Sequence, residues 1–216
     1  MHLNFLHQNA EDRRNIILNG SITPTILLLS VPVLMMGLVQ SAIPVVDGLF
    51  INNFSGTIAA SAIIYSTPVI NMATALAQGL SVASMAIIGQ ANGRSDFDEA
   101  RKTSTQIFVF AFLLGFIIAP LLAVAAFPIS NHVNEQISHD VFLYLALNSL
   151  VLPFSFLEYI YNAIKNASGK PEAAFIRMLM MLVMKIAFNA LFIAVFRWGV
   201  VGSVAATLLS NILISI

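Results

Sequence analysis

One long run of uncharged residues limits what this chain can fold into. From Pro24 to Ile51 about 28 residues follow one another, and Asp47 is the only charged residue among them. As an α-helix this run would be about 40 Å long, whereas the hydrocarbon layer of a membrane is about 30 Å thick. The sequence therefore predicts a helix that spans a membrane.

The acidic residue inside this helix is itself informative. An aspartate at the centre of a spanning helix costs about 2.5–3.5 kcal/mol, and such residues usually mark a pathway for ions or substrates. Gln40, Pro44 and Asp47 share one helical face, because they stand at positions i, i+4 and i+7. We expect this face to look into a protein interior or a water-filled cavity. The alternative is an acid that reaches out to the membrane surface.

Composition supports a membrane protein and excludes several other classes. The chain is 58% hydrophobic and 9% charged, whereas soluble domains carry about 25% charged residues. Ten basic residues balance ten acidic ones, so we expect no nucleic acid partner. There is no cysteine for a disulfide framework. No nucleophile, metal-ligand or phosphate-binding motif is found, so we expect neither an enzyme nor a cofactor.

The hydrophobic runs predict an all-α, polytopic membrane protein with about six spans. The predicted spans are 24–51, 58–88, 103–127, 141–164, 172–196 and 200 onward. We expect residues 1–22 to be a cytoplasmic segment and residues 23–216 to be one six-helix transmembrane lobe. The last span has only 17 residues, about 25 Å, which is marginal for a full crossing. Either the chain is a fragment or its sixth helix, cut short, relies on a partner.

The distribution of lysine and arginine predicts the orientation. Eight of them fall on the side of the N-terminus, and Arg197 alone falls on the other side. Positive residues concentrate in cytoplasmic loops, so we expect a multi-pass protein of the plasma (inner) membrane with a cytoplasmic N-terminus. The eight are Arg13, Arg14, Arg94, Arg101, Lys102, Lys165, Lys170 and Arg177.

Depth in the membrane groups polar residues from three spans. At 1.5 Å per residue, Asp47, Asn189 and Thr207 all lie roughly 7–10 Å from the outer surface. Lys185 lies one turn deeper on the face of Asn189, and its flexible stem reaches toward the same layer. Gln40 lies about two turns below Asp47. We therefore expect an outward-opening polar chamber formed by Asp47, Lys185, Asn189 and Thr207.

Two readings of Asp47 and Lys185 follow from the physics. As a switchable ion pair, the two residues would drive a conformational change when Asp47 is protonated or a cation replaces the lysine. As a structural salt bridge, they would only hold span one against span five. Glu158, in span four, fits a structural role or a cytoplasmic cavity better than the outer chamber.

Several stretches resemble one transporter family. Pro32, Gln40 and the sequence Asp47-Gly-Leu-Phe-Ile resemble the first helix of the multidrug and toxic compound extrusion (MATE) transporters. The small residues of 79–93 and the run 199–207 are similar to the second and sixth helices of that family. The resemblance covers nearly the whole chain, but only the N-terminal lobe of a twelve-helix transporter.

The resemblance implies a secondary active exporter of small organic, often cationic compounds. Such transporters work by antiport with H⁺ or Na⁺ through alternating access, in contact with membrane lipid. The partner implied is a second six-helix lobe, in the same polypeptide or another chain. Asp47 matches the family's cation-coupling aspartate, and Gln40 and Thr207 match polar positions of its first and sixth helices.

The fifth span departs from the family pattern. Many relatives place asparagine and aspartate four residues apart, where this chain has Lys185 and Asn189. One carboxylate of the expected cation site is replaced and a positive charge has entered. Sodium prefers several oxygen ligands and is repelled by an ammonium, so we expect proton coupling, or none, with Lys185 in place of the bound cation.

Two further functions remain open from the sequence. A flippase for lipid-linked glycans, from the same superfamily, would use a more cationic cavity to meet anionic head groups. A non-transporting, truncated lobe that assembles with another membrane chain would explain the abrupt end of the sequence at Ile216.

Overall fold

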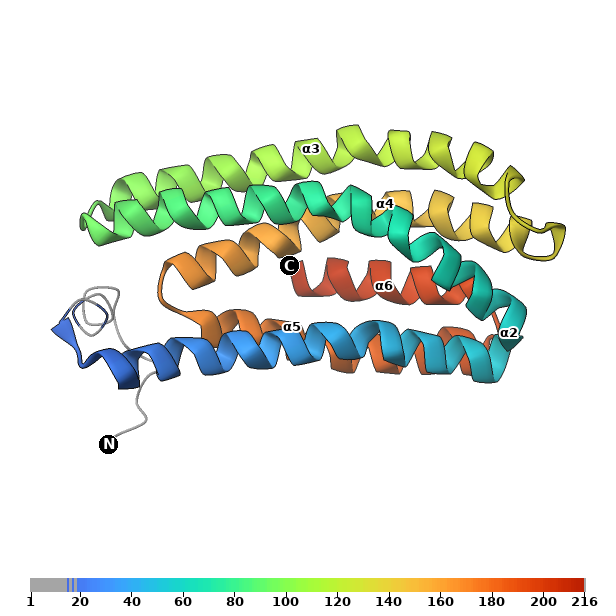
Figure 1. The fold of residues 1–216 in the computed structure, drawn as a ribbon, viewed down its shortest axis with the longest axis horizontal. Helices are drawn as coiled ribbons and strands as arrows, with labels where there is room; N and C mark the ends of the chain where they lie inside the picture. The colour runs from blue at the N-terminus through green and yellow to red at the C-terminus, as the bar shows by residue number, and fades with distance from the viewer. Residues whose placement is uncertain (1–14, 16, 18, 216) are drawn as a thin grey trace.

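The described residues form a bundle of long helices that run back and forth along one axis (Figure 1). The computed structural model describes residues 15, 17 and 19–215, so most of the predicted cytoplasmic segment 1–22 lies outside the described part. The elements are α2 (Ile22–Gly93), α3 (Phe97–Asn131), α4 (Glu135–Ala167), α5 (Pro171–Asn189), η2 (Ala190–Val195) and α6 (Gly199–Ser215).

A single glycine divides α2 into two antiparallel halves. Gly56 has φ 88° and ψ 172°, while residues 22–55 and 57–93 are helical. No atom lies within 4 Å of the position of a Cβ on Gly56, so the positive φ rather than space favours glycine there. The predicted loop 52–57 is therefore wrong in extent. Asn52, Asn53 and Phe54 are exposed. They lie beyond the apolar part of the span, where hydropathy no longer indicates a helix, but the helix continues through them.

The other predicted connectors are also shorter than the sequence indicates. Residues 94–96 alone separate α2 from α3, where a connector was expected over 89–102. Asp96 caps α3, because its side chain accepts a hydrogen bond from the amide of Glu99 at 3.0 Å. Pro128 does not end α3, which continues to Asn131. Polar residues at a membrane surface can stay helical, so hydropathy underestimates helix length.

The fifth span is not a uniform α-helix. At Ala190 it changes into the π-helix η2, in which the amide of Phe196 donates to the carbonyl of Leu191, five residues back. Arg197 and Gly199 then both adopt φ 56° and turn the chain into α6. The prediction of one helix over 172–196 is therefore correct in extent and wrong in its last turns.

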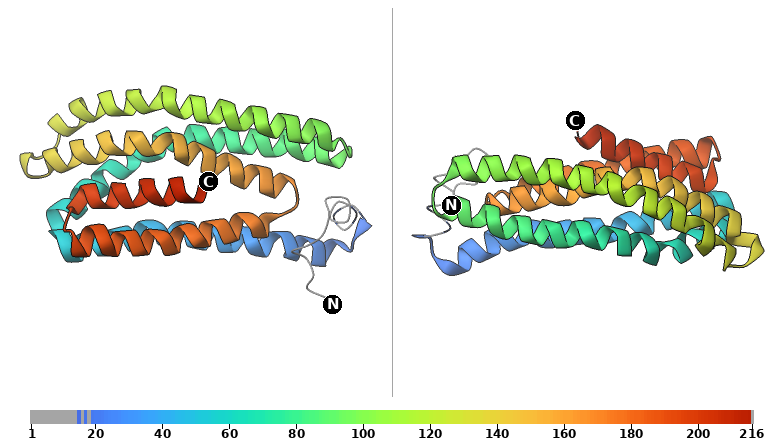
Figure 2. Two further views of the ribbon diagram at one scale, coloured as in Figure 1. Left: turned by 180° about the vertical axis from the view of Figure 1, so that it is seen from behind. Right: turned by 90° about the horizontal axis from the view of Figure 1, so that it is seen from above.

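Close packing between α3 and α4 supplies much of the core. A Cβ added to Gly115 would lie 2.6 Å from the Cα of Pro153, so the two backbones are in direct contact. Small residues are enriched where membrane helices approach closely. Ala62 and Ala77, from the second half of α2, and Ala111, from α3, are buried in the same cluster. The bundle has two layers. The second half of α2, α3 and α4 form one layer, the first half of α2 and α5 form the other, and α6 lies between the two layers when seen from behind (Figure 2, left).

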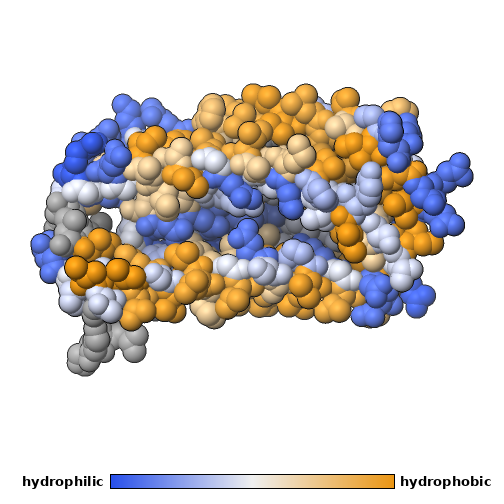
Figure 3. All heavy atoms as spheres, viewed as in Figure 1, coloured by the Kyte–Doolittle hydropathy of each residue, from blue (hydrophilic) through white to orange (hydrophobic). Residues whose placement is uncertain are grey.

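The surface has the pattern of a membrane protein. Figure 3 shows a hydrophobic belt between hydrophilic ends, and the visible face is hollowed along its middle where hydrophilic residues gather. Four helices, α2, α3, α4 and α5 with η2, are long and apolar enough to cross a membrane, and α6 is a shorter apolar helix. The predicted all-α, multi-pass membrane protein is confirmed.

The two ends of the bundle are called inner and outer after the predicted orientation. The inner end contains the turns 94–96 and 168–170, and the outer end contains Gly56 and the turn 132–134 (Figure 1).

Candidate ion and substrate site

Asp47 lies at the contact between the first half of α2 and α5, and both of its carboxylate oxygens are engaged. The side-chain amide of Asn189 donates to Oδ1 at 2.7 Å. The ammonium of Lys185 lies 2.6 Å from Oδ2. All three residues are buried, with exposed fractions of 7% for Asp47, 4% for Lys185 and 0% for Asn189. The ion pair expected from the sequence is therefore present in the structure.

Helix geometry explains why these residues meet. Lys185 and Asn189 stand four positions apart on α5, so both project from one face. That face carries the buried stripe of the helix, together with Met181 and Met178 one and two turns below. An isolated charge at this depth would be costly, and a pair with a good hydrogen bond reduces that cost. The side-chain oxygen Oδ1 of Asn189 is buried without a hydrogen-bond partner.

A cavity of about 560 Å³ begins at this ion pair. Asp47, Lys185 and Thr207 line it, whereas Gln40 and Asn189 are not among its lining residues. The hydroxyl of Thr207 donates to the carbonyl of Ser203 at 2.9 Å, one turn back in its own helix. Its oxygen can still accept a hydrogen bond from a molecule in the cavity. Three of the five predicted site residues thus share one cavity wall.

Gln40 does not join this group. It is exposed, and its side chain interacts with the hydroxyl of Tyr159 on α4. Gln78, from the second half of α2, donates to the same hydroxyl at 3.3 Å. Since seven residues of helix separate Gln40 from Asp47, about 10 Å of rise lies between them. A shared face did not bring Gln40 to the ion pair.

Uncharged polar residues of α4, absent from the sequence-based site, complete the cavity. Tyr144, Asn148 and Ser155 line it together with Asp47. The amide of Asn148 donates to the carbonyl of Tyr144 at 2.7 Å. Their depth in the fourth span was available from the sequence, but neutral polar residues occur on many helix faces and gave no distinct signal.

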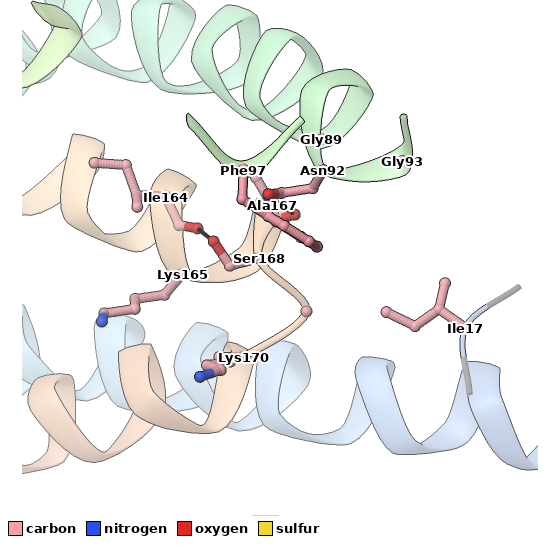
Figure 4. Close-up of a pocket in the computed structure, with 11 residues that line it drawn as sticks. Ile17, Gly89, Asn92, Gly93, Phe97, Ile164, Lys165, Ala167, Ser168 and Lys170 are labelled. Atoms are coloured by element: carbon pink, nitrogen blue, oxygen red, sulfur yellow. Dashed lines mark hydrogen bonds between the residues drawn. The ribbon is translucent and has the colours of Figure 1, made fainter. Parts of the chain in front are cut away.

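A second pocket, of about 400 Å³, lies at the inner end, far along the bundle from Asp47. There the amide of Asn92 donates to the carbonyl of Ala167 at 3.0 Å and ties the end of α2 to the end of α4. The amino groups of Lys165 and Lys170 point away from Ile17 on the opposite wall (Figure 4). This pocket contains none of the predicted site residues.

Comparison with known proteins identifies the family. Residues 32–191 match the family model MatE. The chain belongs to the MatE family. The resemblance found in the sequence is thereby confirmed, and the family is one of transporters.

Relatives of this MatE chain agree in fold. The probable multidrug resistance protein YpnP of Bacillus subtilis (strain 168) is 23% identical over 89% of this chain and 44% of its own length. A MATE crystallised in the bent conformation has a TM-score of 0.85 at 22% identity, over 95% of this chain and 45% of the other. A MOP superfamily transporter from Pyrococcus furiosus has a TM-score of 0.82 at 24% identity, over 88% of this chain and 42% of the other.

The chain therefore spans less than half the length of the relatives it matches. It has the fold of one six-helix lobe of a MATE transporter, as the sequence predicted.

Proposed function

We propose that this MatE chain forms the N-terminal lobe of a secondary active exporter of small organic, often cationic compounds. The observation that carries the proposal is the buried ion pair of Asp47 and Lys185 on the wall of a cavity that could hold a small molecule. A second six-helix lobe, in the same polypeptide or another chain, would face this one, since alternating access needs two bodies that rock against each other. The hydrophilic hollow in Figure 3 is a surface that such a lobe could close.

A proton rather than sodium is the coupling ion that this site favours. The ammonium of Lys185 lies 2.6 Å from Asp47 Oδ2, so a sodium ion bound at the same carboxylate would meet a like charge. Protonation of Asp47 would instead remove the negative partner and release Lys185. The site thus contains an acid, Asp47, that a proton can neutralise, and a cation, Lys185, whose contact depends on the charge of that acid. Coupling requires at least these two groups.

The inner membrane is the location we propose, with the N-terminus in the cytoplasm. Arg94 and Lys170 fall in the turns of the inner end, while Arg197 lies at the outer end. This distribution agrees with the excess of positive residues in cytoplasmic loops.

Efflux measurements with separate ion gradients test this function. The protein that contains this lobe would be reconstituted into liposomes, and transport of the fluorescent cation ethidium would be followed under a pH gradient or a sodium gradient. We expect transport under the pH gradient alone, and its loss in Asp47→Asn. The Lys185→Asn variant should lose proton coupling or become dependent on sodium. Unchanged, sodium-independent transport in Lys185→Asn would remove Lys185 from the mechanism. No transport in any condition would favour a non-transporting lobe.

A flippase for lipid-linked glycans is the second candidate, and buried cations favour it. Lys185, which lines the cavity, and Arg177, which lies outside it, are 4% and 8% exposed, and buried cations suit the binding of anionic head groups. The Pyrococcus furiosus relative was described as having a binding pocket of reverse polarity that suggests a different function. Transport of an anionic polyprenyl-linked phosphate that is not inhibited by ethidium would favour this candidate over the exporter.

A further inference from the structure

The buried stripe of α5 carries a second cation, closer to the inner end. Arg177 is 8% exposed, and its guanidinium lies 4.8 Å from the centre of the Tyr161 ring on α4. One of its terminal nitrogens is buried without a hydrogen-bond partner. Among the described residues, no carboxylate oxygen lies within 4.0 Å of Arg177. A buried charge of this kind needs a nearby opposite charge.

Glu158 of α4 is the acid that faces this cation. It precedes Tyr161 by three residues, so the face of α4 that contacts Arg177 also presents Glu158. Glu158 is partly buried, and the charges that act on it are those of Arg177 and Lys185. In the described chain, Asp47 and Glu158 are the acids that lie well inside the spans rather than near a helix end.

The heights of these residues place Glu158 between the two cations. The short turn 168–170 joins α4 to α5, so heights can be counted from the inner ends of both helices. At 1.5 Å per residue, Arg177 lies about 9 Å above that end, Glu158 about 13 Å and Lys185 about 21 Å. Glu158 is therefore separated from Lys185 by about 8 Å of rise.

The directions of the side chains reduce this separation. Cα–Cβ bonds tilt toward the N-terminus of a helix. In α4, which runs inward, Glu158 leans toward the outer end, and in α5, which runs outward, Lys185 leans toward the inner end. The two side chains therefore lean toward each other. Lys185 nevertheless contacts Asp47 in this structure, and its four-carbon stem gives it the freedom to turn.

We propose that Glu158 is a second acceptor for the Lys185 ammonium, and that the ammonium moves between Asp47 and Glu158 during coupling. This inference rests on the proposed function of Asp47. When Asp47 takes a proton from the outer solution or contacts a cationic substrate, the ammonium leaves it for Glu158. The titratable groups that face Lys185 are then Asp47 from α2, and Tyr144 and Glu158 from α4, with Arg177 on α5 itself. A lysine that loses one carboxylate thus keeps a partner inside the membrane.

Thiol reactivity at position 158 tests the movement without any need for transport. The chain has no cysteine, so Glu158→Cys provides a single thiol for a maleimide. An ammonium close to a thiol favours the reactive thiolate. We expect the thiol of Glu158→Cys to react severalfold faster when Asp47→Asn is also present, and Lys185→Met to cancel that gain. Asn162→Cys, one turn further in, is the matched control and should not respond. Equal rates with and without Asp47→Asn would overturn the proposal.

Thermal unfolding provides a second measurement, in which the reference proteins keep the native carboxylate of Glu158. Glu158→Gln should lower the melting temperature by several degrees more in the Asp47→Asn protein than in the unmodified one, because only there is Glu158 the sole acid available to Lys185. An equal fall in both proteins would contradict the second acceptor. A protein with no efflux can pass both measurements, and an active exporter can fail them, so the inference and the proposed function are tested separately.

Discussion

Two helix contacts in this lobe hold their partners by different means. At the first contact, Gly115 of α3 packs directly against the backbone and Cβ of Pro153 of α4. The contact of α2 with α5 instead centres on Asp47, Lys185 and Asn189. In a membrane the hydrophobic effect does not drive helices together, so close packing and polar contacts are the two means available. We therefore expect the first contact to keep one arrangement, and we propose that a proton on Asp47 can open the second.

The largest effect should come from removal of one charge in the polar contact. Asp47→Ala takes the direct partner away from the buried Lys185 ammonium, and we expect the free energy of unfolding to fall by up to about 3–5 kcal/mol, reduced by whatever the proposed contact with Glu158 restores. The double variant Asp47→Ala with Lys185→Met should lose much less, because it leaves no lone charge. Helical circular dichroism during heating in detergent measures both. If the double variant is as unstable as the single one, the cost is not electrostatic.

A smaller effect is expected from the amide that holds the carboxylate. Asn189→Ala removes a hydrogen bond to a charged acceptor, which contributes about 1.5–3 kcal/mol. Asn148→Ala is the matched control, because its amide donates to the neutral carbonyl of Tyr144 and should cost only about 0.5–1.5 kcal/mol. The same unfolding measurement compares them. Equal losses would mean that the charge of Asp47 adds nothing to this hydrogen bond.

The close-packed contact should respond to added volume. In Gly115→Ala the new Cβ would lie 2.6 Å from the Cα of Pro153, so the helices must separate, at a cost of about 1–3 kcal/mol. Gly79→Ala adds the same methyl where no atom lies within 4 Å and should stabilise its helix by up to about 1 kcal/mol. A harmless Gly115→Ala would show that the α3–α4 contact adapts as readily as the polar one.

The smallest effect on stability is expected at Thr207. Its hydroxyl donates to Ser203 of the same helix, and Thr207→Val should change the free energy of unfolding by less than about 1 kcal/mol. Because Thr207 lines the cavity, the affinity for a transported cation should fall nonetheless. Thr67 is another threonine that lines the cavity. Binding titrations on Thr207→Val and Thr67→Val separate the effect of Thr207 on affinity from its effect on stability. An unchanged affinity in Thr207→Val would exclude Thr207 from the binding site.

The polar contact could be predicted from the sequence because two simple quantities determine it. The rise per residue gives the depth of Asp47, Lys185 and Asn189, and the cost of a lone charge in hydrocarbon favours a contact between the two charged residues. Both statements hold for any packing of the helices. The binding roles of these residues stay predictions, since the geometry establishes only their proximity.

The remaining features depend on packing that the sequence does not show. Gln40 shares the face of Asp47, but at its own height its side chain interacts with Tyr159 of α4. The lining by Tyr144 depends on how α4 rotates against α2. The contact of Gly115 with Pro153 has no signature, because many helices contain an isolated glycine.

The π-helix at the outer end of α5 has a consequence for comparing this chain with its relatives. A π-turn holds about one residue more than an α-turn, and η2 begins directly after Asn189. Within η2, Phe192 stacks its ring on that of Trp198 with centroids 5.2 Å apart, and Trp198, beyond η2, begins the approach to α6. A relative with one residue fewer in 190–195 could keep Asn189 opposite its aspartate and still enter α6 in the same direction. Alignments across this segment should therefore allow a one-residue gap there, so that α6 is not shifted against α5.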